Sequence, residues 1–268
     1  IRLHPGPRVD DPLSTSLEAR GVNRRPYRAD PLDPHVRHML LDGTAVDSTI
    51  HVDLIESEPQ RSQLAALAAA NDRILFENRQ LRAGLFQWLR WTPAEVLRTR
   101  DGMPIGSLEL SRLEQRGFRW MGAWPCADLL SWMGVTRALP RRARRVYARS
   151  AAIGLLSVEG HRREDFVRGG EALEALWLTA TSQGLAFQPI TGLTFLWLRM
   201  RLVDGEGLSP THRRLIARLG QEMGSILPAF LQQTPVVLFR LGQAPAPSQR
   251  AIRLPVEEVL IMEDGAPA

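Results

Sequence analysis

One stretch of this sequence, residues 170–192, constrains the fold more than any other. Its first half has apolar side chains on most faces of a helix, and Leu178 widens the apolar stripe. The apolar positions at helical spacing are Ala172, Leu173, Leu176, Trp177 and Ala180. Such a helix must be covered on several sides, so we expect it at a domain centre or at a subunit interface.

We expect an irregular turn after this helix. Gly184 stands where a helix ends in a left-handed residue, and Pro189 and Gly192 follow shortly after it. Residues 185–192 would then expose backbone N–H groups that no side chain covers, which suits the close approach of a flat ligand. A buried helix followed by an ordinary turn explains the same pattern.

The composition is typical of a globular protein that can bury one core, with 268 residues and a mass of 30.0 kDa. The sequence has no apolar run of the roughly 18 residues that cross a bilayer and no signal peptide, so we expect a cytoplasmic protein without membrane contact. The single cysteine, Cys126, excludes an internal disulfide and a multi-cysteine metal site. The chain begins at Ile1 without a methionine, so both a complete protein and a piece of a longer polypeptide are open.

All 34 basic residues are arginines. The absence of lysine excludes a lysine nucleophile, a Schiff base and a Walker-type phosphate loop, because each needs an ammonium group. One basic run surrounds Pro140 and contains Arg137, Arg141, Arg142, Arg144, Arg145 and Arg149. This run lacks the interleaved aromatic residues of a nucleic-acid platform, so we expect a solvated face and no nucleic-acid partner.

A second group of arginines, at positions 20, 24 and 25, precedes Pro26 and Tyr27. Guanidinium groups gathered in one turn can bind phosphate oxygens in bidentate fashion. A solvated basic turn is the alternative explanation.

The remaining pattern predicts short elements that alternate along the chain. Asp33-Pro34 and Ser209-Pro210 each open a helix, the second ending near residue 219, and Thr92 with Glu95 forms a capping box. Helices are expected over residues 60–71 and 74–91, and strands over residues 50–54, 151–158 and 236–242. Residues 1–16 are expected to be an extended lead-in.

Five of the seven tryptophans, at positions 88, 91, 120, 124 and 132, fall in one excursion of the chain. A lid, the wall of a substrate site and a packing layer all explain this clustering, and a packing layer is the simplest of the three.

Three segments, 20–27, 170–192 and 236–260, resemble the nitroreductase family of FMN enzymes and occur in that family's order. The motifs are Arg-x-x-x-Arg before a Pro and an aromatic residue, Pro-Ile-x-Gly after a core helix, and a closing Pro-x-x-Glu-Val. The match is closest to a subgroup whose single chain contains two lobes. The resemblance implies an α+β fold: a mixed, mainly antiparallel sheet wrapped by helices around a long buried central helix. It also implies a nitroreductase-like domain over residues 17–268, with a Trp-rich insertion at about 77–135.

The resemblance also implies a set of cofactor-binding residues. Arg20 and Arg24 would hold the FMN phosphate together with Arg253, and Arg250 is a second candidate. A basic residue of the run around Pro140, Arg145 or Arg149, would reach the flavin ring or the nicotinamide. The ring would be contacted by Pro189, Ile190, Thr191 and Gly192, with the backbone N–H groups of the last two facing flavin N5 and O4. Val22 replaces a family Ser or Thr, so one hydroxyl contact to the phosphate is missing.

The implied function is that of an FMN-dependent NAD(P)H oxidoreductase. NADH or NADPH would reduce the flavin, which would then reduce a nitroaromatic or quinone-like acceptor by ping-pong hydride transfer. The chemistry is that of the cofactor, so no catalytic side chain and no metal is expected. A second copy or a companion lobe would complete the flavin site, because the family's Pro-Ser-x-x-Asn-x-Gln-Pro-Trp segment is missing here. The alternative is a non-catalytic flavin-holding or interaction module that forms the C-terminal part of a larger multidomain protein.

Overall fold

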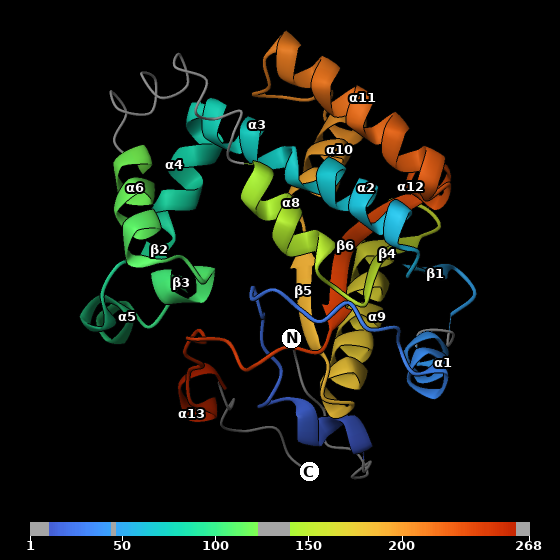
Figure 1. Cartoon of the computed structure of the whole chain (residues 1–268), viewed down its shortest axis with the longest axis horizontal. Helices are drawn as coiled ribbons and strands as arrows, with labels where there is room; N and C mark the ends of the chain where they lie inside the picture. Colours follow the sequence, from blue (N-terminus) through green and yellow to red (C-terminus); the bar gives the residue numbers. More distant parts are fainter. Residues whose placement is uncertain (1–10, 44–46, 123–139, 261–268) are drawn as a thin grey trace, which may run out of the picture.

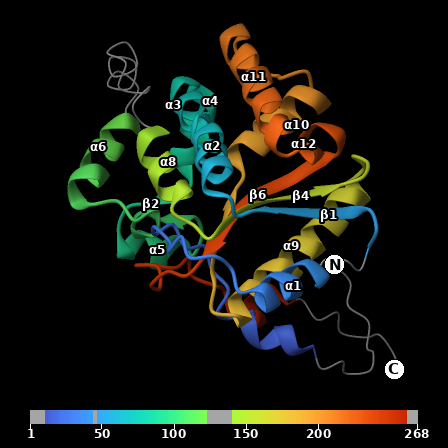
Figure 2. The ribbon, with the colours of Figure 1, turned by 45° about the vertical axis from the view of Figure 1, so that its right-hand side comes forward.

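The computed structural model describes residues 11–43, 47–122 and 140–260. These residues form a four-stranded sheet in the order β1-β4-β6-β5, made of β1 (Ile50–Ile55), β4 (Ala152–Val158), β6 (Thr234–Gly242) and β5 (Ala186–Ile190). Every neighbouring pair is antiparallel, and an isolated parallel bridge between Val22 and Phe187 makes the sheet mixed. Helices cover both faces of the sheet (Figure 1, Figure 2). The expected α+β class with a mainly antiparallel sheet is confirmed.

The two central strands are buried on both faces. All seven residues of β4 are buried, as expected for a strand with neighbours on both sides and helices above and below. β6 alternates between the two apolar cores, with Leu238 in one and Val237 and Phe239 in the other. The strands predicted over 50–54, 151–158 and 236–242 are therefore confirmed.

The apolar helix predicted at 170–183 is the second half of α9 (Arg163–Ser182), which lies along one face of the sheet. Trp177 stacks on Phe187 and Phe187 stacks on Phe239, each with ring centroids 5.0 Å apart. The other residues that cover α9 come from the short 3-10 helix η1 (Pro12–Ser16) and from α1 (Pro34–Asp42). The apolar residues of the second half of α9 are thus covered within the chain, at the centre of the described domain. Gly184, which follows the helix, is left-handed as predicted, with φ +69°.

The opposite face of the sheet carries the larger core. It is covered by α2 (Glu58–Ala69), α8 (Pro140–Ala148), α10 (Gly192–Leu202), α11 (Pro210–Ile226) and α12 (Ala229–Gln232). Ser209 caps α11 as predicted, by accepting a hydrogen bond from His212 N. This helix continues beyond residue 219 to Ile226, and at Gly220 it passes so close to the Trp197 ring that a Cβ atom would approach the ring to 2.2 Å.

Two expected boundaries are wrong. The helix predicted over 74–91 is divided into α3 (Asn71–Glu77) and α4 (Arg79–Gln87), because Asn78 takes an extended conformation and caps α4 with its side chain. The segment predicted as an irregular turn is largely the strand β5, whose residues pair with β6 from Ala186↔Gly242 to Ile190↔Leu238. Pairing with β6 covers one edge of residues 186–190, and Thr191 and Gly192 lie beyond the paired residues.

The described part of the Trp-rich segment lies beside α3 and α4 (Figure 1). It contains β2 (Leu89–Arg90), α5 (Pro93–Thr99), β3 (Met103–Pro104), the 3-10 helix η2 (Ile105–Leu108) and α6 (Arg112–Gly122). The Thr92–Glu95 capping box is present at α5. Trp91 packs on Phe86, while Trp88 and Trp120 are 54% and 70% exposed, and Trp124 and Trp132 lie outside the described residues. A short helix, α13 (Val256–Val259), closes the described chain.

Candidate functional site

Two cavities adjoin at Arg24 and Met103, which line both. The first, of about 350 Å³, gathers the four arginines assigned to the phosphate, and we call it the arginine cavity. The second, of about 670 Å³, is walled by Phe76, Phe118 and aliphatic side chains, and we call it the aromatic cavity. Both volumes fall in the range of small-molecule sites, which is roughly 300–1,000 Å³.

The arginine cavity joins the two ends of the described chain. Arg20 and Arg24 come from the segment between η1 and α1, and Arg250 and Arg253 come from the segment between β6 and α13. Glu18 is the one carboxylate among its described lining residues. Four guanidinium groups around one hollow, with Glu18 in its lining and Glu174 paired with Arg20, form a donor set suited to a phosphate.

Two of these arginines are fixed by neighbouring groups. Arg20 Nε lies 2.9 Å from Glu174 Oε1, and the Arg20 guanidinium carbon lies 4.7 Å from the centre of the Trp177 ring. Arg253 donates to the carbonyl oxygens of Leu17 at 2.6 Å and Arg20 at 2.8 Å. The buried helix α9 thus supplies one wall of the cavity, and Arg253 ties the two arginine-bearing segments together.

Arg24 stands at the junction of the cavities. Its Nη1 donates to the Ser107 carbonyl at 3.3 Å, and burial lowers the pKa of its guanidinium. No carboxylate of the described residues makes an ion pair with it. Arg24 is half-buried and, among the described carboxylates, only Glu109 opposes the burial effect on its pKa, so a bound phosphate would compensate a charge that the protein leaves largely unpaired. This observation fits the phosphate of an FMN.

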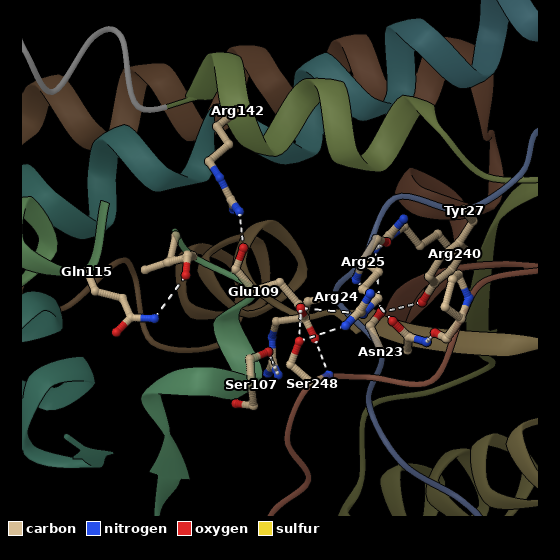
Figure 3. A network of polar contacts seen from close by, with 12 residues as sticks. Asn23, Arg24, Arg25, Tyr27, Ser107, Glu109, Gln115, Arg142, Arg240 and Ser248 are labelled. Atoms are coloured by element: carbon tan, nitrogen blue, oxygen red, sulfur yellow. Dashed lines mark hydrogen bonds and ion pairs between the residues drawn. The ribbon is translucent and has the colours of Figure 1, made fainter. Parts of the chain in front are cut away.

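A fully buried arginine, Arg240 of β6, lies beside Tyr27, Arg25 and Asn23, next to the candidate site (Figure 3). It donates to Gln188 Oε1 at 2.8 Å and to the carbonyl oxygens of Val146 at 2.9 Å and Arg25 at 2.7 Å. Its guanidinium carbon lies 3.8 Å from the centre of the Tyr27 ring. Burial lowers the pKa of Arg240 to about 10, so the side chain stays charged at neutral pH. Arg240 therefore fixes β5, α8 and the turn after Arg24 relative to one another.

The Trp-rich segment is tied to the same turn through Glu109 (Figure 3). Glu109 accepts hydrogen bonds from Ser248 N at 2.6 Å and Ser248 Oγ at 2.7 Å, and its Oε2 lies 3.5 Å from Arg25 Nε. Phe118 stacks on Phe86 with centroids 5.1 Å apart. The described part of this segment thus supplies both a packing layer and one wall of the aromatic cavity.

The aromatic cavity contains a few polar groups on apolar walls. Gln188 reaches it from β5, Tyr147 and Arg142 reach it from α8, and Asp72 reaches it from the first turn of α3. Arg142 Nε lies 2.9 Å from Glu114 Oε1, and its Nη2 donates to the Glu109 carbonyl at 2.7 Å. Burial raises the pKa of Asp72 from 3.8 to about 7, although Arg142 opposes the shift.

The other residues assigned from the sequence lie elsewhere. Arg145 and Arg149 are exposed and line neither cavity, and the same is true of Arg141 and Arg144. Of the described arginines around Pro140, Arg142 lines the aromatic cavity. Arg137 lies outside the described residues.

Pro189, Ile190, Thr191 and Gly192 line neither cavity. They end β5 and begin α10, and Asn71 covers Gly192 so closely that a Cβ atom there would lie 2.1 Å from Asn71 Nδ2. Their predicted contact with the flavin ring stays a prediction.

Sequence reasoning missed Asp72, Tyr147, Gln188, Glu109 and Arg240. For Arg240 a signal was present, since it is a charged residue inside an otherwise apolar strand. Asp72 and Gln188 are ordinary polar residues in sequence, and only the tertiary structure turns them toward the cavity.

Among the residues that the structure describes, no group of three or more His, Cys, Asp or Glu side chains could hold a metal ion. Over the same ranges, no helix has both the length and the apolar character needed to span a membrane.

No protein-family model matches the chain. In sequence it is 29% identical over 262 residues to an uncharacterized protein of Mycobacterium tuberculosis (strain CDC 1551 / Oshkosh), a match that covers 96% of this chain and 36% of that protein. It is 29% identical over 243 residues to a protein of the same strain named "Putative NAD(P)H nitroreductase acg", covering 90% of this chain and 61% of that protein. The chain thus spans less than two thirds of the length of these curated relatives.

Solved structures show the same fold. The chain matches an iodotyrosine deiodinase bound to FMN and 3-iodo-L-tyrosine with a TM-score of 0.51 and 12% identity, over 95% of this chain and 99% of that one. It matches the FMN and NADPH-dependent nitroreductase NfnB from Sphigopyxis sp. strain HMH with a TM-score of 0.51 and 15% identity, over 94% of this chain and 99% of that one. The chain therefore has the nitroreductase fold, and the resemblance to the nitroreductase family inferred from its sequence is confirmed.

Proposed function

We propose that this chain binds FMN, with the phosphate in the arginine cavity, and acts as an NAD(P)H-dependent oxidoreductase of the nitroreductase type. The observation that carries the proposal is the meeting of Arg20, Arg24, Arg250 and Arg253 at one cavity. They come from the two ends of the described chain, so neither the segment with Arg20 and Arg24 nor the segment with Arg250 and Arg253 would form the arginine cavity alone. The names of the similar proteins, which include FMN and NADPH, support the same cofactors.

The residues of the chain would have two tasks. The arginines hold the phosphate and fix the position of the cofactor, and the aromatic cavity offers a dry space for flat rings. When bound, FMN would supply the redox chemistry, a ping-pong transfer of hydride from NADH or NADPH to a nitroaromatic or quinone-like acceptor. Arg24, which lines both cavities, would be the link between the phosphate site and that space.

We also propose that a second copy or a companion lobe completes the site. The covering of α9 within the chain removes one argument for it, but another apolar surface supports it. The segment that carries Arg250 and Arg253 exposes a row of apolar side chains: Ile252, Leu254, Val256, Val259 and Leu260. A partner that packs on this row would stabilise the segment that brings in the arginines. Sedimentation of the purified protein in the presence and absence of FMN tests this part.

The alternative is a module that holds flavin without turnover, as part of a larger protein. One observation favours it: the chain spans only part of the length of its curated relatives.

An absorption spectrum of the purified protein and a titration with FMN test the cofactor. We expect binding of FMN by the wild type and much weaker binding when Arg20 and Arg24 are both replaced by alanine. Arg214→Ala is the matched control, because Arg214 is exposed on α11 and lines neither cavity. Anaerobic stopped-flow bleaching by NADH and NADPH then separates the two functions: rapid bleaching supports the oxidoreductase, and tight binding without bleaching supports the flavin-holding module.

A further inference from the structure

Asp72 places an unpartnered carboxyl group in the aromatic cavity. It lines that cavity together with the apolar side chains of Leu75, Phe76 and Phe118. No described residue makes a hydrogen bond or an ion pair with its side chain. The carboxyl is enclosed by protein on most sides and meets solvent only partly. A polar group in such a place is stabilised either by protonation or by a ligand that completes its hydrogen bonding.

The charged groups that face Asp72 do not neutralise it. Arg142 already pairs with Glu114 and the Glu109 carbonyl, and Arg24 donates to Ser107. Burial outweighs the attraction of Arg142 and raises the pKa of Asp72 to about 7. Both protonation states of this carboxyl are therefore accessible near neutral pH.

The other titratable groups of the cavity keep their charge state in this range. The Ser111 N–H and the Arg142 guanidinium hold the pKa of Glu114 below its usual value, so it stays ionised. Burial raises the pKa of Tyr147, so it stays neutral. Arginine does not titrate near neutral pH, which leaves Asp72 as the lining group of the described residues that changes charge between about pH 5 and pH 9.

We propose that Asp72, in its protonated form, donates a hydrogen bond to an oxygen of a flat aromatic ligand in the aromatic cavity. This inference rests on the proposed function, which supplies the class of ligand. The oxygens of a nitro group, a quinone and a flavin carbonyl only accept hydrogen bonds, so they pair with a carboxylic acid and are repelled by a carboxylate. The apolar and aromatic walls contact the ring, and Asp72 sets its orientation.

Titration calorimetry with nitrobenzene, at a series of pH values and without NAD(P)H, tests the inference. Without a reductant nitrobenzene is not turned over, so the experiment measures binding alone. We expect the affinity of the wild type to fall roughly tenfold between pH 6 and pH 9, the equivalent of one lost hydrogen bond. Asp72→Asn keeps a donor at every pH and should bind with no pH dependence. Glu171→Gln, which removes an exposed carboxylate of α9, should retain the wild-type profile.

A second arm identifies the source of the ring. The same pH series is measured with lumiflavin, which carries the flavin ring without a phosphate, beside nitrobenzene, which represents the acceptor. If saturating FMN displaces nitrobenzene, the cavity holds the flavin ring; if both bind together, it holds the acceptor. Each result supports the proposal, provided that the binding of the ligand in question falls as pH rises through the pKa of Asp72.

Three outcomes overturn the inference: pH-independent binding by the wild type, an unchanged pH profile in Asp72→Asn, or no binding of either probe. Tighter binding at high pH would also overturn it and would indicate a cationic ligand instead. The wild-type series needs no variant, so a variant that fails to fold does not end the test. Because both probes lack a phosphate, failure here is separate from failure of FMN to bind at the arginines.

Discussion

Arg240 and Gln188 face each other across neighbouring strands, and Arg240 Nε donates to Gln188 Oε1 at 2.8 Å. Gln188 lines the aromatic cavity, while the rest of the Arg240 guanidinium holds the carbonyls of the turn that carries Arg24 (Figure 3). The buried Arg240 side chain therefore holds Gln188 of the aromatic cavity and the turn that carries Arg24 of the arginine cavity in fixed positions relative to each other.

Replacement of Arg240 by methionine should destabilise the protein by about 3 kcal/mol or more. The substitution leaves several buried carbonyls without a donor, and each unsatisfied group costs about 1–3 kcal/mol. Urea unfolding of the variant beside the exposed-site control Arg214→Met measures the loss. A midpoint close to that of the control would show that the network contributes little.

Single replacements of the four arginines of the arginine cavity should weaken FMN binding by different amounts. Arg24→Ala should weaken FMN binding most, by about 1.5–3 kcal/mol, because its charge is buried and has no carboxylate partner in the described structure. Arg250→Ala should cost less, since that side chain is exposed and screened by water. Fluorescence titration with FMN at low and high salt gives both values, and equal losses would contradict the ranking.

Asp72→Asn should stabilise the protein above neutral pH. The folded pKa of about 7 exceeds the ordinary value of 3.8, so the penalty of the wild type is absent below about pH 4, grows as pH rises and is complete above pH 7. The full shift would correspond to about 4 kcal/mol, and partial access to water reduces our expectation to about 2 kcal/mol. Thermal unfolding from pH 4 to pH 8 should show a growing gap between variant and wild type. A constant gap would rule out the titration of Asp72 as its cause.

Gly192→Ala should destabilise the protein, because its new methyl group would clash with Asn71. Because the Asn71 side chain can move aside, we expect a cost near the lower end of the roughly 1–3 kcal/mol of overpacking. The double variant Gly192→Ala, Asn71→Ala should recover most of the loss, as chemical denaturation will show. If the double variant folds well but binds FMN poorly, the close backbone approach predicted from the sequence gains support.

The sequence predicted most strands of the sheet, because the spacing of apolar residues along a single sequence indicates which segments are buried strands. The alternation at 50–54 and the apolar runs at 151–158 and 236–242 gave the strands that the structure contains. The weak points were local. Pro189 and Gly192 indicated a turn, yet pairing with β6 overrode that signal and made residues 186–190 a strand.

The candidate site was predictable only where it follows a motif. Arg20, Arg24, Arg250 and Arg253 were found because their spacing resembles a family pattern, and the structure brings them to one cavity. Asp72 and Tyr147 depend on how α3 and α8 pack against the Trp-rich segment, and no local pattern encodes that packing. The inward turn of Arg142 likewise depends on Glu114, which lies 28 residues away in sequence.

The hydrogen bonds from Arg253 to Leu17 and Arg20 join positions 236 and 233 residues apart. Contacts of such long range cost more loop-closure entropy than local contacts and form more slowly. Arg20 and Arg24 are translated before Arg250 and Arg253, so the arginine cavity cannot form until nearly all of the described chain has been translated. We therefore expect the cavity to form in the last stage of folding, after the sheet. Binding of the cofactor would then show that folding of the chain is complete.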